Sequence, residues 1–153
     1  MSQKPLKRHK ALQPLSREHH QGLLLSWKIR AGFTKNIEPR RIRIYANWFF
    51  ENHLIPHFEI EERIIFPILE KNHELVKRAM SEHRRLKRLF SETEDDTKIL
   101  SKIEEELEQH IRFEERVLFP EIQKVATDAQ LLHIGKIHQP ELFIDKLDDE
   151  FWR

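Results

Sequence analysis

One sequence pattern occurs twice in this chain of 153 residues. From His57 the sequence reads HFEIEERIIFP and from His110 it reads HIRFEERVLFP, so both copies share H-x-x-x-E-E-R-x-x-F-P. In each copy a His and a Glu stand at positions i and i+4, which on a helix places both side chains on one face. A single pair of this kind is common on a solvated helix. Two copies followed by the same Phe and Pro indicate helices that carry metal ligands.

The composition favours helices throughout the chain. Three glycines and few alternating runs of β-branched residues leave little material for strands and their turns. Charged residues of both signs recur between apolar ones, which is typical of amphipathic helices. We predict an all-α fold in three parts: an N-terminal arm over residues 1–14, a helical bundle over residues 15–126 and a short C-terminal helical extension over residues 127–153.

Charge, hydropathy and cysteine content exclude several classes of partner and site. With 27 basic and 26 acidic residues, the chain offers no electrostatic argument for nucleic acid as a partner. It contains no run of about 20 apolar residues and no apolar segment of signal-peptide length after the basic N-terminus, so we expect a cytoplasmic protein without a membrane partner. The absence of cysteine restricts any metal site to nitrogen and oxygen ligands.

Hydrophobic periodicity and capping residues predict four helices before the extension. The first is expected from Ser16, as N-cap, to about Phe33, with Leu23, Leu24 and Trp27 on its apolar stripe. The other three are expected over residues 39–71, with a bend at Pro56, from residue 73 to the acidic turn at residues 94–96, and over residues 97–125. In the extension we expect helices over residues 128–138 and 140–153, whose apolar side chains cover the bundle end of a monomer or form a homodimer contact.

Each H-x-x-x-E pair is preceded by a helix that carries one more candidate histidine. The pattern E-H-x-x-L places His83 three residues before Leu86, and alignment at Leu23 in the first helix then gives His20. His19 is the alternative, because a shift of one position exchanges the roles of the two residues.

Helix lengths place these candidates at one level of a bundle. Glu61 and His83 both lie about ten residues from the turn near Asn72, or ~15 Å along antiparallel helices. Two buried carboxylates without cations cost several kcal/mol, and a pair of metal ions would supply the positive charge. We predict six metal ligands, with the two Glu as bridges: His20, His57, Glu61, His83, His110 and Glu114.

Three nearby residues are left outside this ligand set. Glu62 and Glu115 point away from the His of their own motif, so we expect them to pair with Arg63, Arg116 or other helices. His53 lies one turn before His57 and is either a further nitrogen ligand or, as we prefer, a residue of a cavity or of the ligands' surroundings.

Imidazole and carboxylate ligands suit iron, manganese or zinc, and carboxylate bridges between helices are typical of dinuclear iron. The order of His and H-x-x-x-E elements resembles the hemerythrin-like, or HHE cation-binding, domain over about residues 15–125. This resemblance implies an up-and-down antiparallel four-helix bundle with a non-haem centre of two iron ions, bridged by the two Glu and an oxo or hydroxo group, with zinc or manganese as substitutes.

The chain departs from oxygen-carrying hemerythrins at two points. Those proteins have a fifth His on the third helix, where Ala79 and Lys87 stand here, and an Asp five residues after the last His, where this chain has Glu114 at four. We therefore expect a protein that binds or senses a small diatomic ligand (O2 or NO) or iron itself. The alternative is a di-iron enzyme that is peroxidase-like or oxygen-reducing, with an oxidant as its partner. The lack of cysteines for an electron-transfer iron site favours binding.

Overall fold

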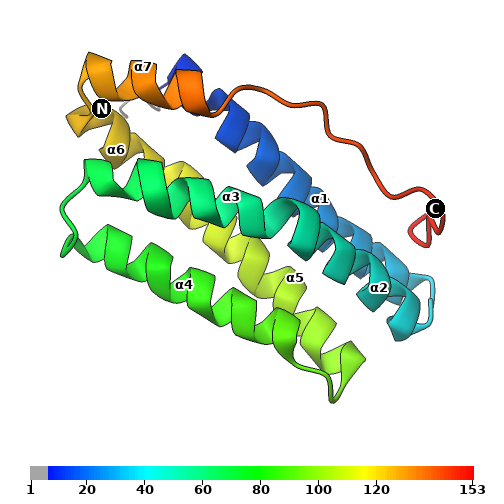
Figure 1. Ribbon diagram of the computed structural model, residues 1–153. Coiled ribbons are helices and arrows are strands. Elements are labelled where there is room, and N and C mark those ends of the chain that lie inside the picture. The colour runs from blue at the N-terminus through cyan, green and yellow to red at the C-terminus, as the bar shows by residue number, and fades with distance from the viewer. Residues whose placement is uncertain (1–6) are drawn as a thin grey trace, which may run out of the picture.

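Helices account for most of residues 7–153, the part of the chain that the computed structural model describes (Figure 1). No strand occurs among these residues, so the prediction of an all-α fold is confirmed. The elements are, in chain order, η1 (Lys10–Leu12), α1 (Gln13–Thr34), α2 (Pro39–Phe49), η2 (Phe50–Leu54), α3 (Ile55–Ile60), η3 (Glu61–Ile65), η4 (Phe66–Ile68), α4 (Glu74–Ser91), α5 (Asp96–Phe113), η5 (Glu114–Leu118), α6 (Phe119–Val125) and α7 (Asp128–Ile137).

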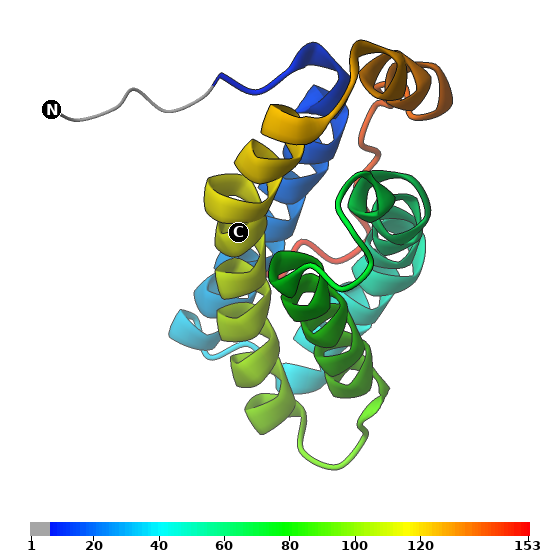
Figure 2. The ribbon, with the colours of Figure 1, turned by 90° about the vertical axis from the view of Figure 1, so that its left-hand side faces the viewer.

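Four long helical spans lie side by side, and each runs opposite to the one before it (Figures 1 and 2). The spans are α1, the continuous path from α2 to η4, α4, and the continuous path from α5 to α6. α5 packs along both α1 and α4, and α7 packs against η1 near the start of α1. Each span therefore presents one face to the interior that the other spans enclose.

Local side chains set several helix starts. Asp95 caps α5 by accepting a hydrogen bond from the backbone N–H of Lys98, as the acidic turn predicts, and His73 caps α4 in the same way. α1 begins earlier than predicted, because Pro14 lies in its first turn, where a fixed φ suits a helix start. Ser16 is not the cap, and its hydroxyl instead donates to Glu115 at 2.8 Å.

The N-terminal arm is shorter than predicted. Its residues 10–14 are helical, and residues 1–6 lie outside the described part of the chain.

The buried face of α1 differs from the predicted stripe by one position. It consists of Leu15, His19, Gly22, Ser26 and Ile29, among others. Trp27 is 49% exposed, although the spacing of apolar residues placed it on the buried stripe. A Cβ atom on Gly22 would lie 2.6 Å from Cδ1 of Ile111, so a larger residue there would force the Ile111 side chain to move. This face includes the small or polar residues His19, Gly22 and Ser26, which a stripe drawn through the apolar residues misses.

Three π-helical turns, η2, η3 and η5, interrupt the long spans just before prolines. In each turn the residue before the proline donates its backbone N–H to the carbonyl five residues earlier. The donor and acceptor pairs are Ile55 and Phe50, Phe66 and Glu61, and Phe119 and Glu114. A proline lacks an N–H and its ring crowds the carbonyl four residues back, so a wider turn lets the span continue. The Phe-Pro of the repeat is therefore part of a turn that begins at Glu61 or Glu114.

The C-terminal extension departs from prediction after α7. Residues 138–153, hereafter the strap, contain no helix and run back along α1 to the far end of the molecule (Figure 1). Phe151 and Trp152 are buried against Tyr45, with ring centroids 5.7 and 5.0 Å from its ring. Leu142 and Leu147, expected on a packed helix face, are exposed. The helix predicted over residues 140–153 is wrong, because contacts distant in sequence hold this segment extended.

Buried apolar side chains form two separate clusters, and buried polar residues lie between them. Along α1, Leu15 belongs to one cluster and Leu25 to the other, with His19 between them. On the next span, Glu61 likewise lies between Phe58 of one cluster and Ile65 of the other. A polar layer thus divides the core.

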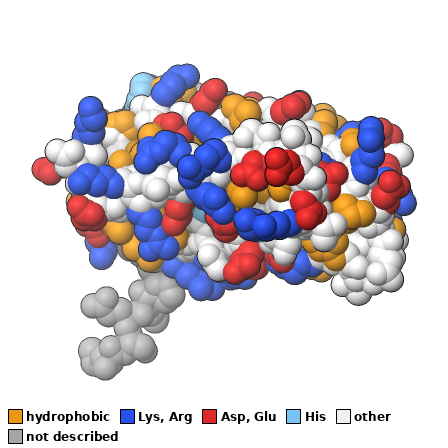
Figure 3. Space-filling view, turned by 90° about the horizontal axis from the view of Figure 1, so that it is seen from below, with side chains coloured by type: hydrophobic (Ala, Val, Ile, Leu, Met, Phe, Trp, Pro, Cys, Tyr) orange, Lys and Arg blue, Asp and Glu red, His pale blue; other side chains and the backbone are white. Residues whose placement is uncertain are grey.

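The described helices include none with the length and apolar character that a bilayer crossing requires. On the face in Figure 3, basic and acidic side chains are interspersed, as the composition predicts.

Candidate metal centre

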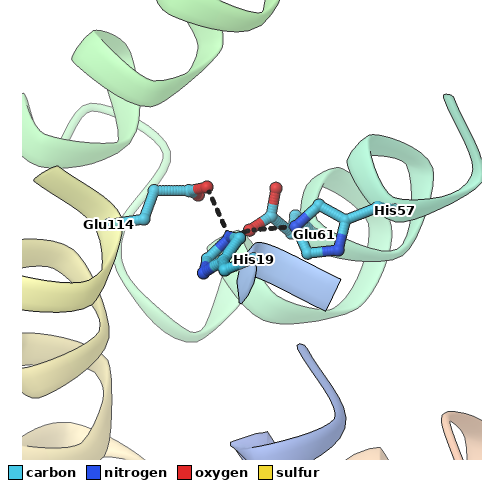
Figure 4. Close-up of side chains that lie close together, drawn as sticks. All are labelled: His19, His57, Glu61 and Glu114. Atoms are coloured by element: carbon cyan, nitrogen blue, oxygen red, sulfur yellow. Dashed lines mark hydrogen bonds and ion pairs between the residues drawn. The ribbon is translucent and has the colours of Figure 1, made fainter. Parts of the chain in front are cut away.

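Two groups of four buried side chains, here together called the His/Glu cluster, share both of their carboxylates. The first group is His19, His57, Glu61 and Glu114, and the second is Glu61, His83, His110 and Glu114. Within each group, one nitrogen or oxygen atom per residue lies within 4.8 Å of the others. Figure 4 shows the first group, with His19 and His57 directed toward the two carboxylates. Each of the four spans contributes to the cluster.

The Nε2 atoms of the histidines face the shared carboxylates. The distances are 3.2 Å from His19 to Glu114, 3.2 Å from His57 to Glu61, 3.1 Å from His83 to Glu61 and 2.9 Å from His110 to Glu114. Both carboxylates are fully buried, and no histidine of the cluster is more than 5% exposed. Each carboxylate therefore lies between imidazoles of different spans.

The structure brings together five of the six residues predicted as ligands and corrects the other by one position. His20 is exposed, whereas His19 is 3% exposed and faces the cluster. The signal that identifies His19 is the residue before it, because Glu18-His19 matches Glu82-His83 when the two segments are aligned at Glu.

Alignment at leucine gave the wrong histidine because the two helices differ four residues after that Glu. The second segment has Leu86 there, and the first has Gly22, which lies against the side chain of Ile111 on α5.

A second set of carboxylates, here called the outer Glu, binds the other nitrogen of every histidine. Nδ1 lies 2.6 Å from Glu115 in His19, 2.6 Å from Glu18 in His57, 2.7 Å from Glu62 in His83 and 2.7 Å from Glu82 in His110. Each pair joins neighbouring spans, so the four contacts form a closed ring around the bundle. An imidazole that donates from Nδ1 to a carboxylate keeps the Nε2 lone pair free for a metal.

The sequence patterns predicted the contacts of two of the outer Glu only in part and did not predict those of the other two. Glu62 and Glu115 do pair with other helices, but their partners are histidines of the cluster, while Arg63 and Arg116 are exposed. Glu18 and Glu82 had no predicted role at the metal site. Their position directly before a cluster histidine is the sequence signal for both.

The carboxylates control the protonation of the histidines. Burial lowers the pKa of His57, but the charge of Glu61 and hydrogen bonds to Glu18 and Glu61 outweigh it and raise the pKa to about 9. Burial likewise lowers the pKa of His110, which Glu114 and a hydrogen bond to Glu82 raise to about 9. Six carboxylates around four imidazoles thus favour positive charge at the centre.

Several polar atoms of the cluster are buried without a hydrogen-bond partner among residues 7–153. They are Nε2 of His57, His83 and His110, both carboxylate oxygens of Glu61, and Oε2 of Glu114. Each buried polar atom left unpaired costs about 1–3 kcal/mol, so a group of six in one place indicates a binding partner. Imidazole nitrogens and carboxylate oxygens fit iron, manganese or zinc. The donor set therefore fits a metal centre.

The family model for the hemerythrin HHE cation-binding domain matches residues 9–122. The chain belongs to this family. The match contains all six residues of the cluster. It covers three of the four helical spans completely and ends within α6, in the fourth span. No curated protein and no solved structure matches the chain significantly. The strap lies beyond the part that defines a hemerythrin domain.

Phenylalanine rings cover the cluster of this hemerythrin domain. Phe119 of the repeat stacks on His19, with ring centroids 5.1 Å apart, and Phe66 lies 5.4 Å from His83 in a tilted arrangement. Phe58 stacks on the same His83 at 3.9 Å. The Phe of each repeat therefore contacts a histidine of the cluster, which explains its fixed distance from the Glu.

One side of the hemerythrin domain opens into a cavity of ≈ 1020 Å³. His19, His57 and His110 line this cavity, whereas His83 does not. His53 also lines it and belongs to neither group of the cluster, in agreement with the preferred reading of that residue.

Proposed function

We propose that this hemerythrin-domain chain is a non-haem di-iron protein, with an up-and-down bundle that holds two iron ions in the His/Glu cluster. The observation that carries the proposal is the overlap of the two groups: each has its own pair of histidines, and both share Glu61 and Glu114. Carboxylates shared between two sites are what a dinuclear centre requires of bridging ligands. Zinc or manganese would fit the same donors.

When bound, the iron pair supplies coordination positions and redox chemistry for a small ligand such as O2 or NO. The chain's own residues prepare the place for it. The outer Glu orient the imidazoles so that their Nε2 atoms face Glu61 and Glu114. Phe66 and Phe119 exclude water from the adjacent His83 and His19. These contacts shield the centre at the two phenylalanine rings, while the cavity leaves a path to it beside His19, His57 and His110.

We propose binding or sensing of a small ligand, or of iron itself, as the role of this centre. The positions at which oxygen-carrying hemerythrins have a fifth histidine hold Ala79 and Lys87, and neither side chain is an imidazole. Ala79 is buried in an apolar cluster, and Nζ of Lys87 lies 3.9 Å from Glu62. Four His and two Glu leave positions on two ions for water or an incoming ligand. The lack of cysteine in the chain supports a role without a built-in electron-transfer site.

The test is the metal content and absorption spectrum of protein purified aerobically from iron-replete cells. The proposal expects about two irons per chain and the near-ultraviolet absorption of a bridged iron pair, followed by a spectral change on addition of NO. A single metal per chain, or iron without a bridge spectrum, would reject a dinuclear centre.

A further inference from the structure

The cavity beside the cluster is far larger than a diatomic ligand needs. Its ≈ 1020 Å³ lies at the upper end of the ~300–1000 Å³ of organic-ligand sites, whereas a water molecule occupies ~30 Å³. Residues of α1, α3, α5 and the strap line it. A space of this size next to the centre has room for an organic ligand much larger than O2 or NO.

The strap makes this cavity a feature of the present chain. His138 lines the cavity and its Nε2 lies 2.7 Å from Oε2 of Glu18, so the strap is attached beside the cluster. The strap begins beyond residue 122, where the match to the family model ends.

One end of the cavity is aromatic. Phe143 of the strap lies 4.7 Å from His53 and 6.1 Å from Phe49, measured between ring centroids, and His53 lies 5.2 Å from Phe49. Burial lowers the pKa of His53, which keeps its ring neutral. These three rings offer faces and edges to the apolar body of a ligand, in particular to another ring.

The other end of the cavity is basic. Arg17 lines it and also lines an adjoining cavity of ≈ 530 Å³ that contains Lys10 and Lys136. Within residues 7–153, none of these three cations has a carboxylate partner. The nearby Glu18 and Glu115, in contrast, are bonded to histidines of the cluster. The charge left free at this end is positive.

Two acidic residues that line the cavities do not alter this arrangement. Asp128 lies in the first turn of α7, where the helix dipole stabilises a negative charge. Glu141 lies on the strap two residues before Phe143 and thus toward the aromatic end.

We propose that this cavity binds an aromatic organic acid, with its carboxylate at Arg17 and its ring against Phe49, His53 and Phe143. Such a ligand would lie across the His19 and His57 side of the cluster, because these residues line the cavity. His83 is fully buried behind Phe58 and does not line the cavity, so the ligand would not reach that histidine. The approach to one particular metal position rests on the proposed function, but the binding of the acid does not.

Calorimetric titration of the full chain with cinnamate, and with the uncharged cinnamyl alcohol, tests the proposal. We expect saturable binding of the acid and about ten-fold weaker binding of the alcohol, since a charged hydrogen bond is lost. Arg17→Gln should weaken cinnamate binding about ten-fold, whereas Arg63→Gln, an exposed arginine outside the cavity, should not change it.

Phe143→Ala tests the aromatic end, with Ile144→Ala, exposed on the same strap, as its control. We expect weaker cinnamate binding only in the first variant. Circular dichroism and proteolysis would show whether the strap of that variant detaches. In that case the Arg17 variant and the titration with cinnamyl alcohol still test the proposal. Absence of saturable cinnamate binding, or equal binding of acid and alcohol, would overturn the proposal.

The titrations are performed on metal-free and metal-loaded protein, with metal content measured separately. Cinnamate binding by a protein that takes up no metal would leave this inference standing and reject the proposed function. Two metals per chain without cinnamate binding would do the reverse.

Discussion

Glu18 directly precedes His19, yet its carboxylate accepts a hydrogen bond at 2.6 Å from Nδ1 of His57, at a separation of 39 residues. Its other oxygen accepts a hydrogen bond at 2.7 Å from Nε2 of His138. Burial raises the pKa of Glu18, but hydrogen bonds from His138 and His57 outweigh it and lower the pKa to about 2. One ionised side chain thus links α1, α3 and the strap at the edge of the cluster.

Glu18→Gln should weaken metal binding about 10–100-fold, because an amide keeps the shape of the side chain but orients and polarises His57 less well. Competition with a chelator of known affinity measures the change. Glu59→Gln is the control, since Glu59 lies on the helix of His57 and is exposed. Equal metal affinity of the two variants would mean that the outer Glu do not support the centre.

His19→Ala should lose most of its bound metal, whereas His20→Ala should keep it. The two residues are adjacent, but only His19 faces the shared carboxylates. Metal analysis of both variants, with circular dichroism to check helix content, gives the answer. Loss of metal in the His20 variant alone would restore the assignment made from the leucine alignment.

The double change Phe66→Leu and Phe119→Leu should retain both metals but admit anions faster. Leucine covers less of His83 and His19 than a ring does, and more water and azide reach the centre. Stopped-flow azide binding and autoxidation rates measure the effect. Phe90→Leu, which removes a ring stacked on Phe50 away from the cluster, is the control. Identical rates in the natural chain, the double variant and the Phe90 variant would show that Phe66 and Phe119 only fill space in the core.

The strap is fastened by a buried ion pair that makes its attachment sensitive to acid. Nζ of Lys28 donates to Asp145 and to Tyr45, each at 2.7 Å, and lies 4.1 Å from the ring centroid of Trp152. Burial raises the pKa of Asp145, but hydrogen bonds from Lys28 and Tyr45 hold it below 3.8, its ordinary value. A carboxylate with a lowered folded-state pKa contributes stability above its unfolded pKa and loses it as pH falls through the folded one.

Asp145→Asn should therefore lower the free energy of unfolding by about 1–3 kcal/mol at neutral pH, since Lys28 loses its charged partner. The difference from the natural chain should shrink as pH falls below ~3.8. Urea titrations at several pH values measure it, with Asp148→Asn, which is 70% exposed, as the control. A difference that stays constant down to the lowest pH would show that the charge of Asp145 does not fasten the strap.

Two glycine substitutions should act in opposite directions. A Cβ atom on Gly32 would lie 2.6 Å from Ile42 and 3.0 Å from Phe151, so Gly32→Ala should destabilise the fold by about 1–3 kcal/mol. No atom lies within 4 Å of the corresponding position on Gly135, so Gly135→Ala should gain up to ~1 kcal/mol of helix propensity. Thermal unfolding of both variants checks the signs. A stabilised Gly32 variant would indicate that the strap does not press on α1 in solution.

The repeated motif allowed four residues of the cluster to be predicted, because helix geometry alone brings each His and its Glu to one face. The pattern E-H-x-x-L added His83. The bend predicted at Pro56 coincides with the π-helical turn η2, and Pro67 and Pro120 also follow such turns, which the sequence patterns did not predict. The position of His19 was harder to predict. It depends on how closely α5 approaches Gly22, and that distance is a tertiary property.

The strap shows that sequence periodicity alone does not determine secondary structure. Its apolar residues recur as on an amphipathic helix, but Asp145 binds Lys28, and Trp152 packs on Tyr45, at separations of more than 100 residues. The segment after α7 is held by these distant partners. The outer Glu were partly hidden for the same reason, because each binds a histidine on a neighbouring span.

Anomalous diffraction from crystals of the iron-loaded protein, recorded on both sides of the iron absorption edge, tests the central claim most directly. The account predicts two iron peaks, one beside Nε2 of His19 and His57 and the other beside Nε2 of His83 and His110, both in contact with the shared carboxylates. A single peak, no peak between the spans, or a peak at His20 would contradict it.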